Sequence, residues 1–329
     1  MPKIDLNGVS LVLMVTMGCN SECSHCCLAS DKSRLGLRLS EADMEYYIRE
    51  ARNVGIQSVV FTGGEPAVYL NNLYSPMALA QSFGMYIDLR TNGFWAENRV
   101  KAQEILARLF SVGLQRLGLS FDRFHEKAIS LNCIRSAIEA AKDIGLQIYL
   151  DWMGKETRDE VLEILGIGDD ELRFAGAPLR IGRARHLPNE CFDALPLEEV
   201  ECYSDFSDTC GQDGDAPLMT VFPGGYVSLH PCCWVHPRLI RKIKNGHGWL
   251  EELILDTVSD PAVNFLCDYG IGGLIGMARE EMPHLLKPYY SHQCEACFDL
   301  LGVLFPSENQ LPDYLNSSTM GKPELAAVR

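Results

Sequence analysis

Three cysteines near the start of the chain constrain its fold and chemistry more than any other feature. Cys19, Cys23 and Cys26 follow a C-x3-C-x2-C spacing directly after an apolar run. Three thiolates on one short loop can hold three of the four irons of a cubane cluster. The remaining iron then lacks a protein ligand, and an open position on a metal centre is where a cofactor or substrate can bind. The spacing therefore predicts a reactive [4Fe–4S] site.

An alternative is that these cysteines are small core residues, because positions i, i+4 and i+7 share one face of a helix. Gly18, Asn20 and Ser21 argue against it. All three residue types favour turns, and together they disfavour a buried helix in this segment. We therefore favour the metal-binding loop.

The composition is that of a globular protein with one large domain or two unequal ones. The 329 residues are 47% hydrophobic and 22% charged, and no apolar run approaches the roughly 20 residues of a membrane span. The N-terminus lacks the apolar core of a signal peptide, so we expect a cytoplasmic protein without a membrane partner. Thirteen cysteines in a reducing compartment indicate metal or redox chemistry before disulfides. The net charge of −15 argues against nucleic acid as a partner.

Strands and helices are predicted to alternate over the first 185 residues. Short apolar runs of strand length recur between amphipathic segments, and Ser40 is placed to cap the first helix. This alternation is typical of an α/β fold with right-handed crossovers and a parallel sheet. The predicted strands are residues 9–16, 57–62, 85–90, 116–120, 146–150 and 172–181, and the predicted helices are one that begins after Ser40, 70–83, 97–109, 133–144 and 159–165.

Polar and glycine-rich residues follow the predicted strands, where ligands bind in sheets of this kind. The cysteine loop follows the first strand and Gly63-Gly64-Glu65-Pro66 follows the second. Two residues without Cβ let the backbone approach a ligand closely, and Glu65 can accept a charge-assisted hydrogen bond from an ammonium group. Further polar residues, among them Asn92 and Ser120, follow the third and fourth strands. The sequence therefore predicts one active site at this rim of the sheet.

The cysteine loop and the Gly-Gly-Glu-Pro motif together resemble those of the radical S-adenosylmethionine (SAM) superfamily. In that family three cysteines bind a [4Fe–4S] cluster, and the amino and carboxylate groups of SAM chelate the fourth iron. His25 stands before the third cysteine, where the family signature has an aromatic-type residue. The resemblance covers roughly the first 185 residues. It implies a partial (β/α)6 barrel and a 5′-deoxyadenosyl radical that abstracts a hydrogen from the substrate.

Similar enzymes bind SAM through residues that follow the second, third and fourth strands. The Gly-Gly-Glu motif would hold the methionine amino group, and groups after the next two strands would bind the carboxylate and ribose. A helix-capping serine and a surface arginine are the open alternative for Ser120 and Arg135. The set implied for SAM binding is Gly63, Gly64, Glu65, Asn92, Ser120, Asp122 and Arg135.

The alternation stops after about residue 187, and a loop-rich segment with many cysteines follows. One hairpin is predicted there, with strands at 218–222 and 226–229 around a Pro-Gly-Gly turn. Helical stretches are expected near residues 250–255 and 274–281. We therefore expect a radical SAM partial barrel over residues 1–187, a small second domain over 188–309 and a mobile polar tail over 310–329.

The second domain resembles the twitch module, the shortened form of the SPASM domain, which holds an auxiliary [4Fe–4S] cluster. The matching cysteines are Cys210, Cys232, Cys294 and Cys297. Two departures stand out: the gap from Gly225 to Cys232 is longer than usual, and Cys202 competes with Cys210 as the first ligand. A structural zinc ribbon is the alternative, because four thiolates suit zinc as well.

Many proteins with this two-part layout modify ribosomally made peptides, and Gly182-Arg183-Ala184 also resembles that group. We therefore predict a peptide substrate and an electron donor such as flavodoxin or ferredoxin. No leader-binding domain is expected before the first strand, so the barrel or a separate leader-binding protein would bind the peptide. Epimerisation is favoured among the peptide chemistries, because the thiol of Cys233 could return a hydrogen to a substrate radical.

Other chemistries remain open for the same layout. They are oxidative crosslinking, thioether formation and the oxidation of a small alcohol. A non-catalytic Fe–S or zinc module is disfavoured, because it leaves the Gly-Gly-Glu-Pro motif without a purpose.

Overall fold

The computed structural model describes residues 8–174, 176–203, 218–229, 236–243, 249–307 and 311–315. The chain divides into two compact units. Unit 1 holds residues 1–23, 30–177 and 220–224, and unit 2 holds residues 24–29, 178–219 and 225–329. The cysteine loop is thus shared, because Cys19 and Cys23 belong to unit 1 and Cys26 to unit 2.

Unit 1 is built on a parallel sheet whose strands follow one another in chain order. Strands β1 and β6 are not paired in the described part of the chain, so the sheet is open and does not close into a barrel. The predicted α/β fold with six parallel strands is confirmed. Strand β8 (Leu218–Phe222) extends the sheet beyond β1, and its residues from Thr220 onward belong to this unit. The parallel strands are β1 (Ser10–Thr16), β2 (Ser58–Gly63), β3 (Tyr86–Thr91), β4 (Arg116–Ser120), β5 (Gln147–Trp152) and β6 (Leu172–Phe174).

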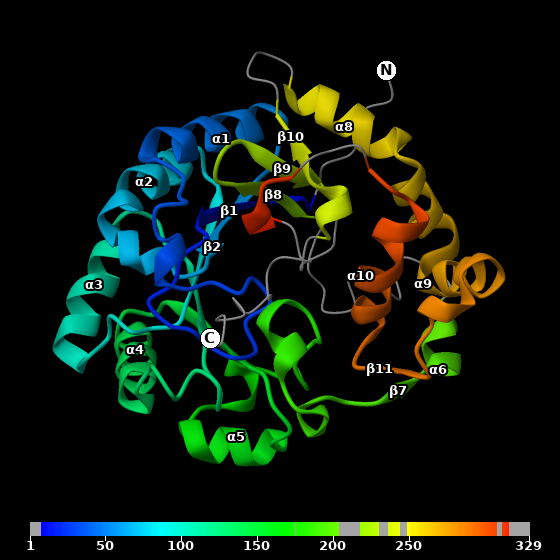
Figure 1. The fold of residues 1–329 in the computed structure, drawn as a ribbon. Coiled ribbons are helices and arrows are strands. Elements are labelled where there is room, and N and C mark those ends of the chain that lie inside the picture. Colours follow the sequence, from blue (N-terminus) through cyan, green and yellow to red (C-terminus); the bar gives the residue numbers. More distant parts are fainter. Residues whose placement is uncertain are drawn as a thin grey trace, which may run out of the picture. The chain divides into compact units, whose positions relative to one another are not determined.

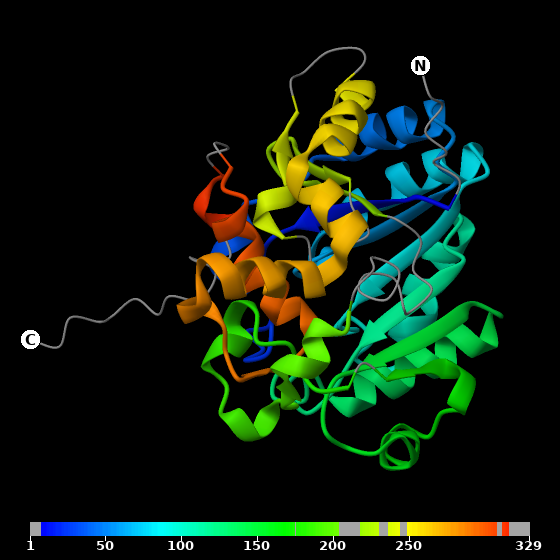
Figure 2. The same cartoon turned by 90° about the vertical axis from the view of Figure 1, so that its right-hand side faces the viewer.

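Helices connect these strands and lie on the outer side of the sheet (Figure 1). The predicted cap is confirmed, because the Ser40 hydroxyl accepts a hydrogen bond from the Asp43 amide and the Asp43 carboxylate accepts one from the Ser40 amide. Figure 2 shows the strands from the side, with helices α1 to α4 on one side of them. The helices are α1 (Glu41–Asn53), α2 (Tyr74–Ser82), α3 (Arg99–Ser111), α4 (Leu131–Asp143) and α5 (Arg158–Leu165).

The two faces of strand β3 differ in polarity. Ile87 and Leu89 on β3 are fully buried, whereas Asp88 between them points to the opposite face and is 1% exposed. Its carboxylate accepts hydrogen bonds from Nη2 and Nε of Arg116 on β4, at 2.7 and 3.1 Å. Strand β1 is instead buried on both faces from Leu11 onward, as its uninterrupted apolar run predicts.

Two predicted elements differ in length from the observed ones. The helix predicted over 70–83 begins as a 3-10 helix, Pro66–Asn72, before α2. The strand predicted over 172–181 ends at Phe174, because Gly176 adopts a positive φ of 71° and Pro178 lacks an amide hydrogen. A 3-10 helix, Gly182–His186, follows instead of strand.

Unit 2 is mainly helical. Its core gathers buried side chains from α6 (Leu197–Glu201), α9 (Pro261–Glu281) and α10 (Gln293–Leu304). Helix α8 (Trp249–Ser259) precedes α9, which bends at Gly270. The predicted helices near 250 and 274 are confirmed, but α10, which carries Cys294 and Cys297, was not predicted as a helix. The short strands are β7 (Leu195–Pro196) paired with β11 (Tyr289–Tyr290), and β9 (Tyr226–Leu229) paired with β10 (Arg241–Lys242).

Two further sequence predictions can be compared with the described residues. Strands β8 and β9 have the bounds predicted for the hairpin. Within the tail predicted to be mobile, Asp313–Leu315 form a 3-10 helix and Leu315 is fully buried, because its apolar side chain finds a packed site. The boundary at residue 187 stays a prediction. No helix among the described residues combines the length and apolar character needed to cross a membrane.

Candidate functional site

The Gly-Gly-Glu motif fastens the cysteine loop to the end of β2. The Gly64 amide donates to the Thr16 carbonyl at 2.7 Å, and the Glu65 amide donates to the Gly18 carbonyl at 2.9 Å. A Cβ on Gly64 would lie 2.0 Å from the Gly18 oxygen, and Gly63 has a φ of 138°. The close approach that these glycines permit is therefore to the backbone of the cysteine loop, whereas the sequence predicted an approach to a ligand.

Glu65 is a fully buried carboxylate surrounded by neutral donors. Oε1 accepts hydrogen bonds from the Ala67 amide at 2.9 Å and the Thr91 hydroxyl at 2.7 Å, and Oε2 accepts one from the Asn92 amide at 2.7 Å. Burial raises the pKa of Glu65 to about 7, although these hydrogen bonds and the charge of His125 oppose the rise. A cationic or N–H donor ligand would offset the burial of the ionised form.

Asn92 connects this carboxylate to the cysteine loop. Its side-chain amide donates to Oδ1 of Asn20 at 2.9 Å and to Sγ of Cys19 at 3.8 Å. The structure thus brings together three residues that the sequence predicted from separate motifs: Cys19, Glu65 and Asn92. Asn20 and Thr91 complete the arrangement. The sequence interpretation treated Asn20 as a turn former and Thr91 only as one of the polar residues that follow the third strand.

A second contact to the cysteine loop comes from the segment after β4. Asp122 is 1% exposed, and its Oδ1 accepts hydrogen bonds from the amides of Phe124 and His125 at 2.8 and 2.9 Å. Nδ1 of His125 lies 3.0 Å from the same oxygen. Burial would lower the pKa of His125, but its hydrogen bonds with Asp122 and Cys23 raise it to about 10. Asp122 therefore fixes a turn that presents His125 to the thiol of Cys23.

The remaining residues predicted to bind SAM are less closely connected. Ser120 ends β4, where it is the register partner of Asp151 on β5. Arg135 lies on the outer helix α4, and its guanidinium donates to the Ile164 carbonyl at 2.8 Å. No contact in the described part of the chain joins Arg135 to Glu65 or Asn92.

In unit 2, the third cysteine of the loop packs against the 3-10 helix Gly182–His186. The Cys26 carbonyl accepts hydrogen bonds from the amides of Ala29 and Arg183, at 3.1 and 2.9 Å. Gly182 has a φ of 59°, and a Cβ there would lie 2.1 Å from the Cys27 oxygen. Only glycine fits this position, which gives the Gly-Arg-Ala sequence a structural role.

The C-x2-C pair of unit 2 lies in the first turn of α10. His292 caps this helix through Nδ1, which accepts from the Cys294 amide at 3.2 Å. Glu295, between the two cysteines, is 3% exposed and accepts from the Ser291 amide and hydroxyl at 2.6 and 2.7 Å and from Lys287 Nζ at 2.8 Å. These hydrogen bonds lower the pKa of Glu295 against the effect of burial. The hydrogen bonds of Glu295 therefore fix the helical turn that carries Cys294 and Cys297.

The other cysteines predicted for the second metal site lie mostly outside the described residues. Cys210, Cys232 and Cys233 lie outside the described residues. Cys202, the alternative to Cys210 as first ligand, follows α6 and is exposed. Its Sγ donates a hydrogen bond to the Glu198 carbonyl at 3.3 Å. All described cysteines are free of disulfides.

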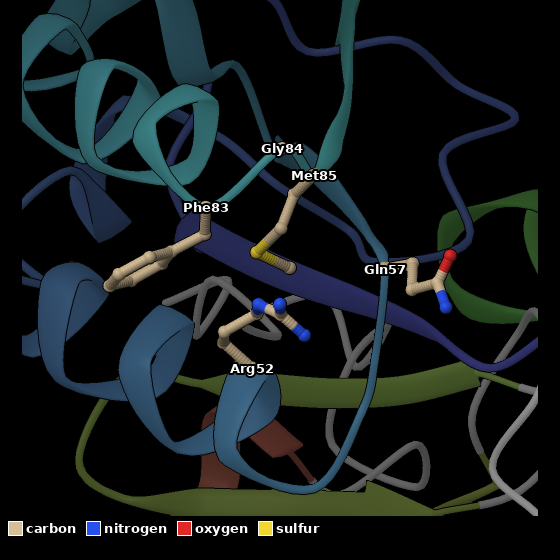
Figure 3. Close-up of a pocket in the computed structure, with 5 residues that line it drawn as sticks. All are labelled: Arg52, Gln57, Phe83, Gly84 and Met85. Carbon is tan, nitrogen blue, oxygen red and sulfur yellow. The ribbon is translucent and has the colours of Figure 1, made fainter.

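One surface pocket of unit 1 lies away from these residues. Gln57 and Met85 directly precede β2 and β3, so the pocket they line is at the amino ends of the strands. In Figure 3 the side chains of Arg52, Phe83 and Met85 surround it. Ligands of parallel sheets bind at the opposite, carboxyl ends, so this pocket is not the candidate site.

The donor set around the cysteine loop fits an iron–sulfur cluster and SAM. Cys19 and Cys23 are buried, undisulfided thiols, and thiolates are the ligands of such clusters. The dry carboxylate of Glu65 fits an amino group. In unit 2, the described pair Cys294 and Cys297 fits half of a four-thiolate site.

Comparison with known proteins agrees with this donor set. Residues 13–166 match the model of the radical SAM superfamily. The chain is 28% identical to the putative peptide biosynthesis protein YydG of Bacillus subtilis (strain 168), over 45% of this chain and 47% of that protein. It is 31% identical to a probable GTP 3′,8-cyclase of Methanothermobacter thermautotrophicus, over 42% and 45% of the two chains.

Two further similarities concern other reactions and a solved structure. The Fe-coproporphyrin III synthase of Methanosarcina barkeri is 28% identical over 40% of this chain and 31% of that protein. The structure of BtrN in complex with AdoMet and 2-DOIA gives a TM-score of 0.44 at 14% identity, covering 80% of this chain and 88% of the other. The match to each of the three curated relatives spans less than half of that relative's length.

Proposed function

Because residues 13–166 form a radical SAM domain, we propose that this protein removes a hydrogen atom from a peptide and so modifies one of its residues. The observation that carries the radical chemistry is the hydrogen-bonded set of Cys19, Asn92 and Glu65. The similarity to a peptide biosynthesis protein supports the peptide substrate. An electron donor such as flavodoxin or ferredoxin is the partner that this chemistry requires.

The chain's own residues have distinct tasks at this site. Cys19, Cys23 and Cys26 would hold a [4Fe–4S] cluster, which supplies the electron for cleavage of SAM to a 5′-deoxyadenosyl radical. Glu65 would accept a hydrogen bond from the SAM amino group at a position buried from solvent. Asn92 hydrogen-bonds both the Glu65 carboxylate and Asn20 of the cysteine loop, and so fixes their relative positions.

Three further residues predicted to bind SAM have these positions in the fold. Ser120 lies at the end of a strand, where ligands of such sheets bind. Asp122 acts mainly by fixing the turn that presents His125 to Cys23. Arg135 would have to leave the Ile164 carbonyl to reach SAM.

A second cluster would be held by four cysteines of the C-terminal region. Two of these, Cys294 and Cys297, lie in the first turn of α10, which the hydrogen bonds of Glu295 fix. The other two in this proposal are Cys210 and Cys232. Zinc is the alternative metal for the same ligands.

For the reaction on the peptide, we favour epimerisation at an α-carbon. Bound SAM would supply the 5′-deoxyadenosyl radical that accepts the α-hydrogen and so becomes 5′-deoxyadenosine. The thiol of Cys233 would then give a hydrogen atom to the opposite face of the carbon radical. The resulting thiyl radical requires one electron and one proton to restore the thiol, and the second cluster or the external donor would supply the electron. The peptide leaves with no net oxidation.

The experiment is a turnover of the anaerobically reconstituted protein in D2O, with dithionite or flavodoxin as reductant. The substrates offered are short peptides encoded by any reading frame found beside its gene. Epimerisation predicts one deuterium at the changed carbon and an unchanged peptide composition. The Cys233→Ala variant should still form 5′-deoxyadenosine but yield no epimer. A product that has lost two hydrogens would instead establish oxidative crosslinking or thioether formation. No reaction with the peptide, but turnover with GTP, would favour the activity named for the cyclase relative.

A further inference from the structure

His125 reaches a sulfur of the cysteine loop from a distant part of the sequence. Both His125 and Cys23 belong to unit 1. Cys23 is buried, the His125 side chain is 15% exposed, and the two side chains are hydrogen-bonded. An imidazole therefore contacts one of the three thiols proposed to bind iron, within a single unit of the fold.

The direction of this hydrogen bond follows from the chemistry of a cluster ligand. A thiolate bound to iron carries no proton, so its sulfur can only accept a hydrogen bond. A neutral imidazole has one N–H group and a protonated imidazole has two, so either form can donate. In the protein with its cluster, the His125 ring is therefore the donor and the Cys23 sulfur the acceptor.

The main chain at His125 is fixed by contacts that do not involve Cys23. Oδ1 of Asp122 accepts hydrogen bonds from the amides of Phe124 and His125, at 2.8 and 2.9 Å. The His125 carbonyl accepts from the amides of Ala128 and Ile129, both at 2.9 Å. The turn is thus closed on both sides of His125.

The same segment is also anchored to β5 and to the loop that follows it. Phe121 is 1% exposed, its ring centre lies 6.1 Å from that of Trp152, and its amide donates to the Asp151 carbonyl at 3.1 Å. Nε of Arg123 donates to the Glu156 carboxylate at 3.2 Å. The fold therefore places the His125 ring beside Cys23 through contacts that are independent of the thiol.

Cys19, the other cysteine of the loop in unit 1, also has hydrogen-bond donors at its sulfur. Its Sγ accepts from the Ser21 amide at 3.3 Å and from the side-chain amide of Asn92 at 3.8 Å. Reduction of a cluster adds negative charge to its sulfurs, and hydrogen bonds to them stabilise that charge. Donors to ligand sulfurs therefore favour the reduced cluster.

We propose that the His125 ring donates a hydrogen bond to the Cys23 sulfur and so raises the reduction potential of the [4Fe–4S] cluster that cleaves SAM. This inference rests on the proposed function, in which Cys19, Cys23 and Cys26 are the cluster ligands. His125 acts through Cys23 and is a positioning residue, not a ligand. Its effect makes the cluster easier for an electron donor to reduce.

The test uses the full chain with Cys294 and Cys297 replaced by Ala, so that only the first cluster can form in anaerobic reconstitution. About four irons per chain establish that cluster. Their absence from this protein overturns the proposed ligand set independently of His125. If the double variant does not fold, the unmodified chain is used, and the cluster is identified by the change that SAM causes in its electron paramagnetic resonance (EPR) spectrum.

Pulsed EPR of the reduced cluster, in protein labelled with ¹⁵N-histidine, detects the hydrogen bond itself. It should show one weak nitrogen coupling and one exchangeable proton, and both should disappear in His125→Phe. A strong nitrogen coupling, typical of direct ligation, would overturn the proposal. Absence of any nitrogen coupling would overturn it too.

The reduction potential of the same cluster provides the second measurement. His125→Phe keeps a ring but removes the donor, so the reduction equilibrium should fall about tenfold, which is 59 mV for a one-electron couple. His125→Gln retains an N–H donor and should recover part of this loss. The exposed His284 is the matched control, and His284→Phe should leave the potential unchanged.

Two results for the potential would contradict the proposal. One is an unchanged potential in four-iron His125→Phe protein. The other is an equal fall in His125→Phe and His125→Gln, which would mean that the ring acts by packing alone. If neither variant folds, the ¹⁵N measurement on the unmutated His125 decides the question.

Discussion

Glu65 and Glu295 are the same residue type and are almost equally buried, but their pKa values are shifted in opposite directions. Glu65 is 0% exposed and Glu295 is 3% exposed. The hydrogen-bond donors to Glu65 are two amides and a hydroxyl, and its pKa is raised to about 7. Glu295 is bonded by Lys287, with Arg180 at 3.7 Å, and its pKa is lowered.

The contrast separates a ligand-binding group from a structural one. A buried carboxylate that the protein supplies with its own cation has little to gain from a ligand. A buried carboxylate whose hydrogen-bond donors are all neutral keeps a raised pKa even though the charge of His125 acts against the rise, and a bound amino group can offset its penalty for ionisation. Glu65 is therefore prepared for a ligand, whereas Glu295 stabilises the turn of the C-x2-C pair.

The largest expected effect comes from removing the ligands beside Glu65. Replacement of Cys19, Cys23 and Cys26 by Ala should reduce the iron content from about eight to about four atoms and abolish SAM cleavage, because two cubanes are proposed. Iron analysis and chromatography of 5′-deoxyadenosine measure the two outcomes. Eight irons in the variant would mean that these cysteines are not cluster ligands.

The Glu65→Gln variant tests the first half of the comparison. It should weaken SAM binding by about 1.5 to 3 kcal/mol, because a charge-assisted hydrogen bond is lost. Iron content should stay the same, since Glu65 is not a ligand. Calorimetry with SAM measures the affinity, and Glu104→Gln, an exposed position on α3, is the matched control. Equal SAM affinity in wild type and Glu65→Gln would mean that the Gly-Gly-Glu motif only positions the cysteine loop through its backbone hydrogen bonds.

The Glu295→Gln variant tests the second half. It should leave SAM affinity unchanged but weaken metal binding at Cys294 and Cys297 by about tenfold to a hundredfold, as is common for groups that orient metal ligands. Competition with a metal chelator measures this affinity. Glu280→Gln, exposed at the end of α9, is the control. A loss of SAM binding in Glu295→Gln would contradict the division of roles.

A smaller effect is expected from pH. Without SAM, Glu65 ionises near pH 7, and SAM favours its ionised form, so SAM affinity should rise about fourfold from pH 6.5 to pH 8. The Glu65→Gln variant should lack this part of the pH dependence. In the unliganded protein the sign is reversed: the folded carboxyl keeps its proton up to about pH 7 while the unfolded one loses it near 4.5, so this group makes folding stability fall as pH rises between these values. If SAM affinity in Glu65→Gln showed the same pH dependence as in wild type, the dependence would come from a group other than Glu65.

Local patterns made much of the fold predictable from sequence. The buried run of β1, the cap at Ser40 and the alternation of strands and helices depend on neighbouring residues, and the structure agrees with them. The early end of β6 was missed because the apolar residues after Phe174 continue a strand pattern, whereas Gly176 and Pro178 break the ladder. A pattern of residue types does not show which of two such signals prevails.

Residues of the site were predictable only where they belong to a short sequence motif or directly follow a predicted strand. Cys19 and Glu65 come from recognisable motifs, and Asn92 from its place after a strand. The contact of His125 with Cys23 joins segments a hundred residues apart, and a side chain's reach across the fold leaves no local pattern.

The packing of Gly182 and Arg183 on the carbonyls of Cys27 and Cys26 has a consequence for biosynthesis. Residues 24–29 belong to the unit formed with residues from 178 onward, although they are among the first to leave the ribosome. The first two cysteines can be positioned by the N-terminal half as it emerges. The third has a local hydrogen bond from the Ala29 amide, but it gains its partner from the rest of unit 2 only when Arg183 has been translated. Insertion of iron and sulfide into the nascent chain is therefore expected to wait until more than half of the chain has been made.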